Sequence, residues 1–291
     1  SKFYRFLVEY RDYNFAGKVM EFFVTHQTVE HFSGDCAVAF VFKDKTHQNK
    51  DLQQLLELNR FDATLGATLM LSQVSGYKTK RLLIVGLGDT SLNEKNYMKV
   101  LQSLSSALSD AKVKNVVIAD IQIDNRDESW IQLTTARVLR NASYQVEKVD
   151  AKEDNEQGTL EAVSIYSENN DAAEINKGLA IANGMALTRR LGDLPSNICT
   201  PSYLAETAKS LAKNYNLECE VLEESDMEAL GMNSLLSVSK GSSEPGKLIS
   251  LSYNNAGKDQ PVVLVGKGVT FDSGGISLKP GAKMDEMKFD M

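Results

Sequence analysis

Short apolar runs alternate with helix-spaced apolar residues through the first half of the chain. The runs rich in Val, Ile, Leu and Ala, which are typical of buried strands, cover residues 36–42, 81–88 and 115–119. Helical spacing of apolar residues marks segments 52–58, 65–71 and 95–108. Strands that alternate with helices need crossover connections, which favour a largely parallel sheet with helices on its faces. The alternation therefore predicts an α/β fold.

The second half continues with the same two kinds of element. Helical spacing predicts a long helix over residues 174–192 and a second helix that Thr200 caps, with Pro201 at its first position. Four short runs, at 217–222, 234–238, 247–253 and 261–265, are predicted strands. A polar stretch at 167–171 has no apolar period. We therefore expect two domains, residues 1–166 and 167–291, each a mainly parallel or mixed sheet flanked by helices.

Length, charge and cysteine content narrow the classes of function. A chain of 291 residues suits about two domains. Its net charge of −7 argues against a general binder of nucleic-acid backbones. Cys36, Cys199 and Cys219 are far apart and fit neither a zinc spacing nor a disulfide framework. The start of the chain lacks a secretory pattern, and no apolar run approaches the roughly 18 residues of a membrane span. We expect a cytoplasmic protein without a membrane partner.

Chemistry-bearing residues gather near the end of the sequence. Residues 261–265 are all apolar, as in a central parallel strand, and Lys267 follows them. In open α/β sheets, ligands bind at that end of a strand. Asp272 precedes a pair of glycines, which indicate a turn with positive φ or a close backbone approach. Lys279 and Asp290 complete the set.

Three interpretations of this set can be compared. A phosphate-binding loop requires Gly, four residues, Gly-Lys and then Ser or Thr. Here the first of these positions is Pro261, and Gly268 follows Lys267, so that pattern fails twice. A salt-bridged surface loop is compatible with two lysines beside two aspartates. A metal site is also compatible, because carboxylates bind divalent cations and a neutral lysine amine can join them. The residue types alone leave these last two interpretations open.

The order of the residues is more specific than their types. The segment VGKGVTFDSGGISLKP, residues 265–280, closely resembles the signature of the leucyl aminopeptidase family, the cytosolic two-metal exopeptidases. The segment MDEMKFDM, residues 284–291, continues it in register. Shorter similarities extend the resemblance back to about residue 173. Before that point, it depends on little more than the turn at residues 85–88.

The resemblance assigns a role to each candidate residue. It implies two divalent ions, zinc or manganese, with Lys267 ligating one of them through its amine. Asp272 would bridge both ions, and Asp290 would ligate the same ion as Lys267. Lys279 would be the catalytic lysine that polarises the scissile carbonyl. Lys279, Met287 and Asp290 would bind substrate, with Met287 lining the pocket for the first side chain.

The resemblance also implies a class of substrate and an oligomeric state, and it shows that one family motif is missing from this sequence. The substrates would be peptides with a free N-terminus, preferably leucine-like, and the full-length protein would be a homo-hexamer. The N-terminal domain would serve regulation or assembly. Family members carry a later Asn-Thr-Asp-Ala-Glu-Gly-Arg motif, which does not occur here. We therefore expect the second domain to be incomplete and this chain to be inactive alone. The alternative is a non-enzymatic DNA-binding or regulatory protein that uses the N-terminal domain, which the negative net charge disfavours.

Overall fold

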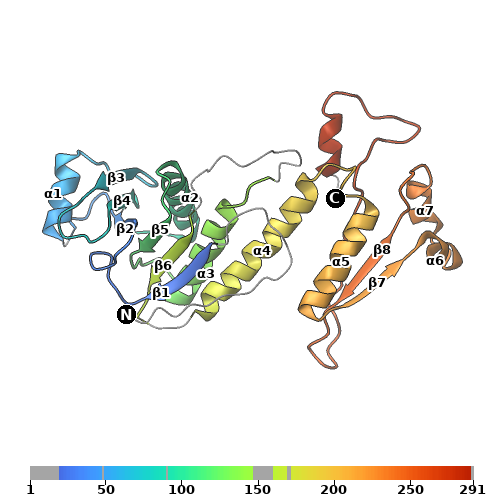
Figure 1. Ribbon diagram of the computed structural model, residues 1–291, viewed down its shortest axis with the longest axis horizontal. Helices are drawn as coiled ribbons and strands as arrows, with labels where there is room; N and C mark the ends of the chain where they lie inside the picture. Colours follow the sequence, from blue (N-terminus) through green and yellow to red (C-terminus); the bar gives the residue numbers. More distant parts are fainter. Residues whose placement is uncertain (1–19, 48, 90, 147–159, 169–171, 290–291) are drawn as a thin grey trace. The chain divides into compact units, whose positions relative to one another are not determined.

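The computed structural model describes residues 20–47, 49–89, 91–146, 160–168 and 172–289. The chain divides into two compact units, Ser1–Ala186 and Leu187–Met291, whose elements are drawn in Figure 1. This division falls inside a long helix, 20 residues after the predicted domain boundary at 166/167. Residues 169–171 of the polar stretch lie outside the described residues, and the boundary at 166/167 stays a prediction.

The first unit is built on one six-stranded sheet. Its spatial order is β1-β6-β5-β2-β4-β3, and every neighbouring pair is parallel except β3 with β4. The strands are β1 Glu21–Thr25, β2 Cys36–Val41, β3 Thr68–Ser72, β4 Arg81–Gly86, β5 Asn115–Ile118 and β6 Ala162–Tyr166. The predicted α/β fold class with a mainly parallel sheet is therefore confirmed.

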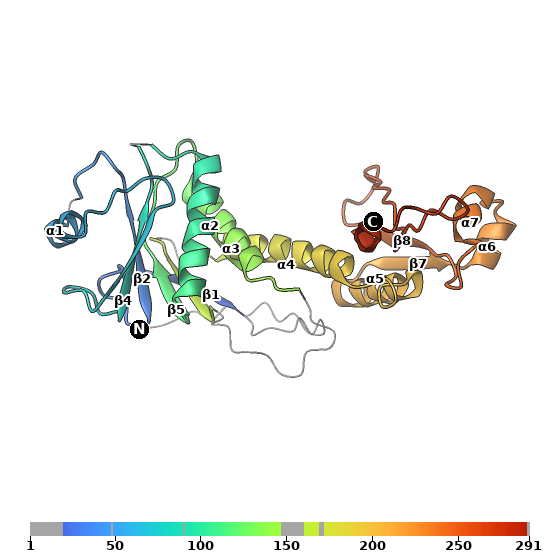
Figure 2. The ribbon, with the colours of Figure 1, turned by 90° about the horizontal axis from the view of Figure 1, so that it is seen from above.

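Helices cover both faces of this sheet. Helix α1 (Lys50–Leu58) packs on one face, and α2 (Glu94–Asp110) and α3 (Glu128–Ala142) pack on the other, as Figure 2 shows from above. The strand residues alternate accordingly: Leu82 and Ile84 join the cluster under α1, whereas Leu83 and Val85 join the cluster under α2 and α3. Each face thus takes every second residue, which is the period of a pleated strand.

Helix α4 (Ala173–Asp193) matches the helix expected at 174–192. Its buried residues, Ile175, Gly178, Ala182 and Ala186, recur at helical spacing. A Cβ atom on Gly178 would lie 2.3 Å from the backbone oxygen of Leu133 in α3. The absence of a side chain at this position therefore allows α3 and α4 to approach closely.

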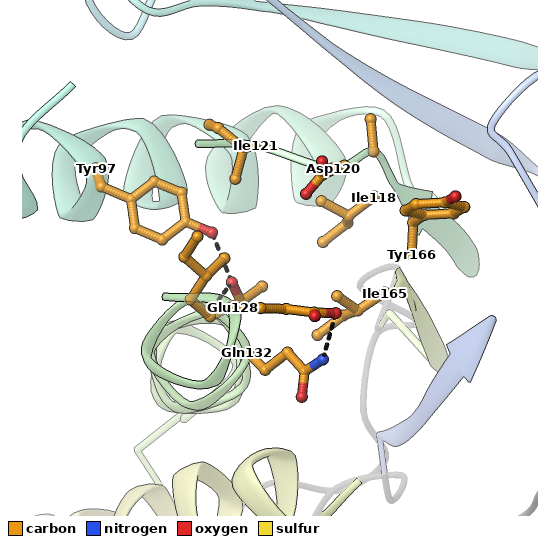
Figure 3. A pocket seen from close by; sticks show the side chains of 11 residues that line it. Tyr97, Ile118, Asp120, Ile121, Glu128, Gln132, Ile165 and Tyr166 are labelled. Atoms are coloured by element: carbon orange, nitrogen blue, oxygen red, sulfur yellow. Dashed lines mark hydrogen bonds between the residues drawn. The ribbon is translucent and has the colours of Figure 1, made fainter. Parts of the chain in front are cut away.

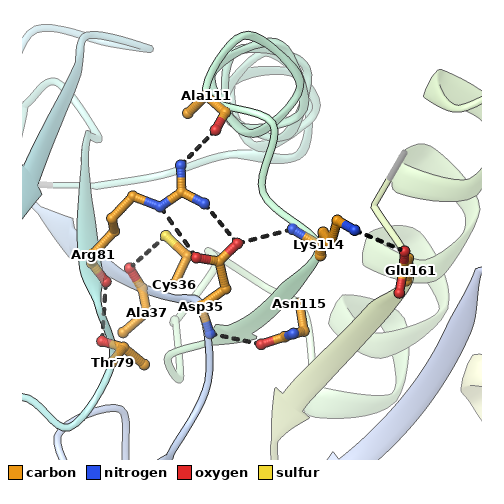
Figure 4. A network of polar contacts seen from close by, with 9 residues as sticks. All are labelled: Asp35, Cys36, Ala37, Thr79, Arg81, Ala111, Lys114, Asn115 and Glu161. Carbon is orange, nitrogen blue, oxygen red and sulfur yellow. Dashed lines mark hydrogen bonds and ion pairs between the residues drawn. The ribbon is translucent and has the colours of Figure 1, made fainter. Parts of the chain in front are cut away.

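A polar network holds the amino ends of β2 and β4 together (Figure 4). The guanidinium of Arg81 donates to both carboxylate oxygens of Asp35, at 3.2 and 2.6 Å, and also to the carbonyl of Ala111. The backbone N–H of Lys114 donates to the same carboxylate at 3.0 Å. Burial raises the pKa of Asp35, but the hydrogen bonds from Arg81 and Lys114 outweigh it, so the pKa lies below its ordinary value.

The second unit pairs a long helix with a two-stranded sheet. Helix α5 (Pro201–Tyr215) begins as predicted, because the Thr200 hydroxyl accepts the N–H of Tyr203 and Pro201 occupies the first turn. Strands β7 (Glu218–Leu222) and β8 (Leu248–Ser252) are antiparallel. The remaining elements are α6 Glu224–Ala229, α7 Asn233–Ser239 and the 3-10 helix η1 Met284–Phe289. No helix within the described ranges has the length and apolar character needed to cross a membrane.

Two short segments differ in type from the prediction. Residues 65–71 were expected to be helical, yet residues 68–72 form strand β3, which pairs antiparallel with β4. Leu69 and Leu71 pack against one face of the sheet and Met70 against the other, so the apolar residues follow period 2. Residues 234–238 were a predicted strand, but they belong to helix α7. Five residues with three apolar side chains are too few to distinguish a strand from a single helical turn.

A third difference concerns residues 261–265, the predicted central strand. The structure gives these residues no strand, and the side chains of Val262, Leu264 and Val265 are 89, 91 and 94% exposed. A strand is stabilised by neighbours that pair with its backbone and cover its side chains. Within the described part of the chain, the second unit has only the β7-β8 pair, and its register does not include this run.

Candidate functional site

The candidate site is a loop that runs from Lys267 to helix η1. Its tightest part is the turn from Asp272 to Lys279, where the backbone N–H of Lys279 donates to the carbonyl of Ser273 at 3.0 Å. Gly274 and Gly275 have φ of +94° and +72°, so the positive φ expected for the paired glycines is confirmed. A Cβ on Gly274 would lie 2.3 Å from the carbonyl oxygen of Ser277. The turn therefore requires glycine at position 274.

This turn brings three of the predicted site residues together. The ammonium Nζ of Lys279 lies 2.8 Å from Oδ2 of Asp272 and 3.4 Å from Sδ of Met287. The other carboxylate oxygen of Asp272 accepts the backbone N–H of Gly274 at 3.1 Å. The side chains of Lys279 and Asp272 are 36 and 34% exposed, so the pair is only partly shielded from water. The arrangement holds one ammonium in a defined position beside a carboxylate and a thioether.

Helix η1 supplies the third member of this group and is itself anchored. The N–H of Asp272 points to the carbonyl of Met287, with N and O 3.4 Å apart. The next residue, Lys288, donates from Nζ to the carbonyl of Asp193 at 2.7 Å. Asp193 is the last residue of α4 and belongs to the same compact unit as η1. This anchor was not predicted, and no local pattern indicates it, because its partners are 95 positions apart in the sequence.

The remaining two predicted ligands are placed differently. Lys267 is exposed and lies on the segment without regular secondary structure that precedes the turn. Asp290 lies outside the described residues, so its distance from Lys267 and Asp272 is not defined here. The described contacts thus join Asp272, Lys279 and Met287. The predicted roles of all five residues stay predictions.

The donor groups near the turn can be compared with the needs of a divalent cation. Asp272 offers a carboxylate and Lys267 an amine, which are the right chemical types. However, zinc takes four ligands in most protein sites, and no group of three His, Cys, Asp or Glu residues suited to a metal occurs among the described residues. Both oxygens of Asp272 also already accept hydrogen bonds. The described residues alone therefore do not fit a two-metal centre.

A separate small pocket lies in the first unit, at the carboxyl ends of β5 and β6 (Figure 3). Inside it the hydroxyls of Tyr97 and Thr135 are 2.6 Å apart, and the Gln132 amide donates to Glu128 at 3.1 Å. Partial burial, and then the nearby charge of Glu128, raise the pKa of Asp120 at its rim. The pocket contains none of the predicted site residues. Desolvation and nearby negative charge are sufficient to explain the raised pKa of Asp120.

Two models of one protein family match this chain. The model described as the cytosol aminopeptidase family, N-terminal domain, matches residues 37–153. The model described as the cytosol aminopeptidase family, catalytic domain, matches residues 186–291. The second match includes the whole loop from Lys267 through η1. This match begins at residue 186, one residue before the start of the second compact unit.

Individual relatives agree with the family models. The chain is 52% identical over 272 residues to a probable cytosol aminopeptidase of Vesicomyosocius okutanii, a match that covers 94% of the chain and 57% of the relative. It is 40% identical over 292 residues to a probable cytosol aminopeptidase of Nitrosomonas europaea, covering 94% of the chain and 59% of that relative. The chain thus spans a little more than half the length of these relatives.

Solved structures share the fold at lower identity. A tomato leucine aminopeptidase mutant has a TM-score of 0.72 at 23% identity, covering 95% of this chain and 58% of that chain. The bottromycin maturation enzyme BotP in complex with Mn has a TM-score of 0.68 at 24% identity, covering 88% of this chain and 53% of that chain. These similarities concern the fold alone. The chemistry of the site has to be inferred from the residues of this chain.

Proposed function

Since the chain belongs to the cytosol aminopeptidase family, we propose that it carries the N-terminal domain and the first part of the catalytic domain of a metal-dependent aminopeptidase. The proposed reaction is hydrolysis of the first peptide bond of peptides, with leucine-like N-terminal residues preferred. This chain corresponds to 57% of its relative from Vesicomyosocius okutanii, so the proposed activity is that of the whole protein.

The convergence of Asp272, Lys279 and Met287 is the observation that carries this proposal. Hydrolysis of an amide passes through a tetrahedral intermediate with a developing negative charge on the former carbonyl oxygen. A lysine ammonium held in a fixed position can stabilise that charge. Lys279 is held by Asp272 at 2.8 Å and approached by the Met287 sulfur at 3.4 Å, while remaining 36% exposed and so open to a substrate. We assign Lys279 the role of this ammonium.

Two further roles concern the substrate. The thioether of Met287 is soft and adaptable, which suits a pocket for an aliphatic N-terminal side chain. It lies beside the Lys279 ammonium, so the side chain and the scissile carbonyl of one residue can reach both groups. Asp290 would bind the α-amine end of the substrate. A free α-amine would then be required, which restricts cleavage to the N-terminus.

The complete protein would use two divalent ions, zinc or manganese. Lys267, Asp272 and Asp290 would be ligands from this chain, and the remaining carboxylates would come from the later catalytic-domain sequence. A relative of the same fold is described in complex with Mn. Since the described residues do not fit a two-metal centre by themselves, we expect the polypeptide of residues 1–291 to hydrolyse no leucine amide on its own.

The partners follow from the proposed reaction. Peptides with a free N-terminus would be the substrates, and the full-length protein would be a homo-hexamer, as the family resemblance implies. The name cytosol aminopeptidase of its relatives supports a cytoplasmic location. The alternative, a DNA-binding or regulatory protein, would require a basic face on the N-terminal domain. The net charge of −7 disfavours this alternative.

The test uses a fused polypeptide. Residues 1–291 are joined to the sequence of the Vesicomyosocius okutanii relative that lies C-terminal to the match, and the product is loaded with Mn²⁺ or Zn²⁺. Release of ammonia from leucine amide is compared with release from N-acetyl-leucine amide, which lacks the free α-amine. We expect hydrolysis of leucine amide alone. The unfused polypeptide of residues 1–291 should release no ammonia from either substrate.

Two results would count against the proposal. Equal hydrolysis of the acetylated and free substrates by the fused polypeptide would exclude an aminopeptidase that recognises the α-amine. Hydrolysis of leucine amide by residues 1–291 alone, in a preparation whose intact mass is near 32.1 kDa, would show that the later ligands are unnecessary.

A further inference from the structure

Helix η1 depends on its neighbours for stability. It is a 3-10 helix of six residues, and none of these residues is fully buried. The hydrogen bonds of a 3-10 helix have poorer geometry than those of an α-helix, so a short helix of this kind needs contacts with other elements. Met287, which the proposed function places in the pocket for the first side chain, lies on η1. The position of Met287 therefore depends on what holds η1.

Two neighbouring residues of η1 contact the last turn of α4. The ammonium Nζ of Lys288 donates to the carbonyl of Asp193 at 2.7 Å, and it lies 4.8 Å from the centroid of the Phe289 ring. A Cβ atom on Gly192 would lie 3.9 Å from Cδ1 of Phe289, so this ring packs against the backbone of Gly192. Both contacts lie within the second compact unit. A polar and an apolar contact thus place η1 against the carboxyl end of α4.

The carboxyl end of a helix is a favourable position for a cation. The last carbonyls of an α-helix lack partners within the helix, and the macrodipole gives this end a partial negative charge. An ammonium that donates to such a carbonyl forms a stronger hydrogen bond than a neutral donor does. Asp193 is the last residue of α4, and its contact with Lys288 is partly buried. Charge and geometry therefore both favour Lys288 as the anchor of η1.

Met287 connects this anchor to the candidate site. Its carbonyl accepts the backbone N–H of Asp272 at 3.4 Å, and its sulfur lies 3.4 Å from Nζ of Lys279. Met287 directly precedes Lys288 in the sequence, so a displacement of the anchor also displaces Met287. If η1 moved away from the turn, the space beside the Lys279 ammonium would become wider and less well defined.

We propose that Lys288 is a positioning residue that determines specificity for the first side chain of the substrate. By binding the end of α4, Lys288 fixes η1 and keeps Met287 beside the Lys279 ammonium. Lys288 acts through Met287 and does not itself touch the substrate. The inference rests on the proposed aminopeptidase function, in which Met287 lines the pocket for an aliphatic side chain.

The first test follows Met287 without measuring hydrolysis. The methionine methyl groups of residues 1–291 are isotopically labelled for NMR, and Met287→Leu identifies the signal of Met287. Lys288→Leu removes the ammonium, so η1 should be released and the Met287 signal should move towards that of a solvent-exposed methionine. Lys288→Arg should keep the signal close to its position in the parent chain, because a guanidinium can donate to the same carbonyl.

Lys283 provides the matched control. It lies directly before η1, its side chain is 77% exposed, and it pairs with Glu286 at 3.7 Å. This ion pair lies within one short segment and does not involve α4. Lys283→Leu makes the same chemical change as Lys288→Leu but should leave the Met287 signal in place.

The second test measures discrimination between substrates. The kcat/KM of the fused polypeptide is determined for leucine amide and for alanine amide. Their ratio does not depend on the fraction of active protein, so a loss of folded enzyme alone leaves it unchanged. Lys288→Leu should lower the ratio at least about 10-fold, which is the lower end of the effect of one methylene group in an apolar pocket. Lys283→Leu and Lys288→Arg should keep the parent ratio.

Three results would overturn the proposal. The first is a Met287 signal that Lys288→Leu leaves unchanged, and the second is an equal movement of this signal in Lys288→Leu and Lys283→Leu. The third is an unchanged ratio in Lys288→Leu when the parent fused polypeptide hydrolyses both amides, which leaves the proposed function intact. If the parent hydrolyses neither amide, the proposed function fails and the specificity role fails with it, whereas the Met287 signal still decides whether Lys288 anchors η1.

Discussion

Gly274 determines the conformation of the turn between Asp272 and Lys279. Its φ of +94° and the 2.3 Å approach of a Cβ to the Ser277 carbonyl both exclude a side chain. Gly274→Ala should therefore cost about 1–3 kcal/mol locally and open the turn. Amide hydrogen exchange of residues 272–280 should become faster.

Gly281→Ala is the matched control for this variant. A Cβ at position 281 would have no neighbouring atom within 4 Å, so exchange of residues 272–280 should be unchanged. If Gly274→Ala and Gly281→Ala gave the same exchange rates as the parent chain, the turn would not depend on a glycine at position 274.

Asp35 should make the stability of the first unit depend on pH. Its pKa in the folded chain lies below 3.8, because hydrogen bonds from Arg81 and Lys114 outweigh the opposing effect of burial. A depressed pKa means that the stabilisation is present above about pH 4 and is lost as the pH falls through the folded pKa. Asp35→Asn removes this titration.

The measurement is the free energy of urea unfolding of the parent chain and Asp35→Asn at pH 6 and at pH 3. At pH 6 the variant should be less stable by about 2 kcal/mol, as expected for hydrogen bonds to a charged group. At pH 3 this difference should shrink. A difference that is equal at both pH values would mean that the carboxylate charge does not stabilise the fold.

At the scale of elements, the contact between α3 and α4 depends on one position of α4. A methyl group on Gly178 would collide with the backbone oxygen of Leu133, which belongs to a helix and has little freedom to move. Gly178→Ala should lower the stability of the first unit by about 1–3 kcal/mol through overpacking. The free energy of unfolding measures this effect.

Gly184 lies on the same helix, and a substitution by alanine there should have the opposite effect on stability. A Cβ there has no neighbour within 4 Å, so Gly184→Ala should stabilise α4 by up to about 1 kcal/mol through helix propensity. Opposite signs for the two substitutions are the predicted result. Destabilisation of similar size by both would show that α4 does not pack on α3 as described.

The elements that could be predicted from sequence share strong local patterns. The strand at 81–88 and the helix at 95–108 were predicted because their apolar periods extend over at least one full strand or several helical turns. Residues 68–72 were mistaken for helix, because pairing with β4 in an edge position is a tertiary effect. Residues 234–238 were mistaken for strand, because their run is too short to show a period.

The candidate site was also predictable from the sequence only in part. Lys267, Asp272, Lys279, Met287 and Asp290 could be proposed because their order in the sequence resembles a family signature. A salt-bridged loop was one open interpretation of the lysines and aspartates, but the sequence did not indicate that Lys279 pairs with Asp272, at 2.8 Å. The anchor of Lys288 on the end of α4 could not be proposed, since it depends on the path of η1. Sequence order identifies candidate groups, whereas the fold determines which of them meet.

At the scale of the whole molecule, the two units differ in how far their apolar residues are covered within the described part of the chain. The first unit has a six-stranded sheet covered on both faces, with large cores under α1 and under α2 and α3. Among its described residues, the second has the two-stranded sheet of β7 and β8 and exposed apolar residues at 262–265. The loop from Lys267 to η1 directly follows these exposed residues in the sequence.

The most direct test of this account is the effect of Lys279→Met on turnover of leucine amide by the fused polypeptide. Methionine is also unbranched and only one heavy atom shorter than lysine, and it removes the ammonium. We predict that kcat falls about 100- to 1,000-fold, as for loss of one group that stabilises the oxyanion, while the manganese content of the purified protein is unchanged. An unaltered kcat at equal manganese content would contradict the assignment of Lys279 as the catalytic ammonium.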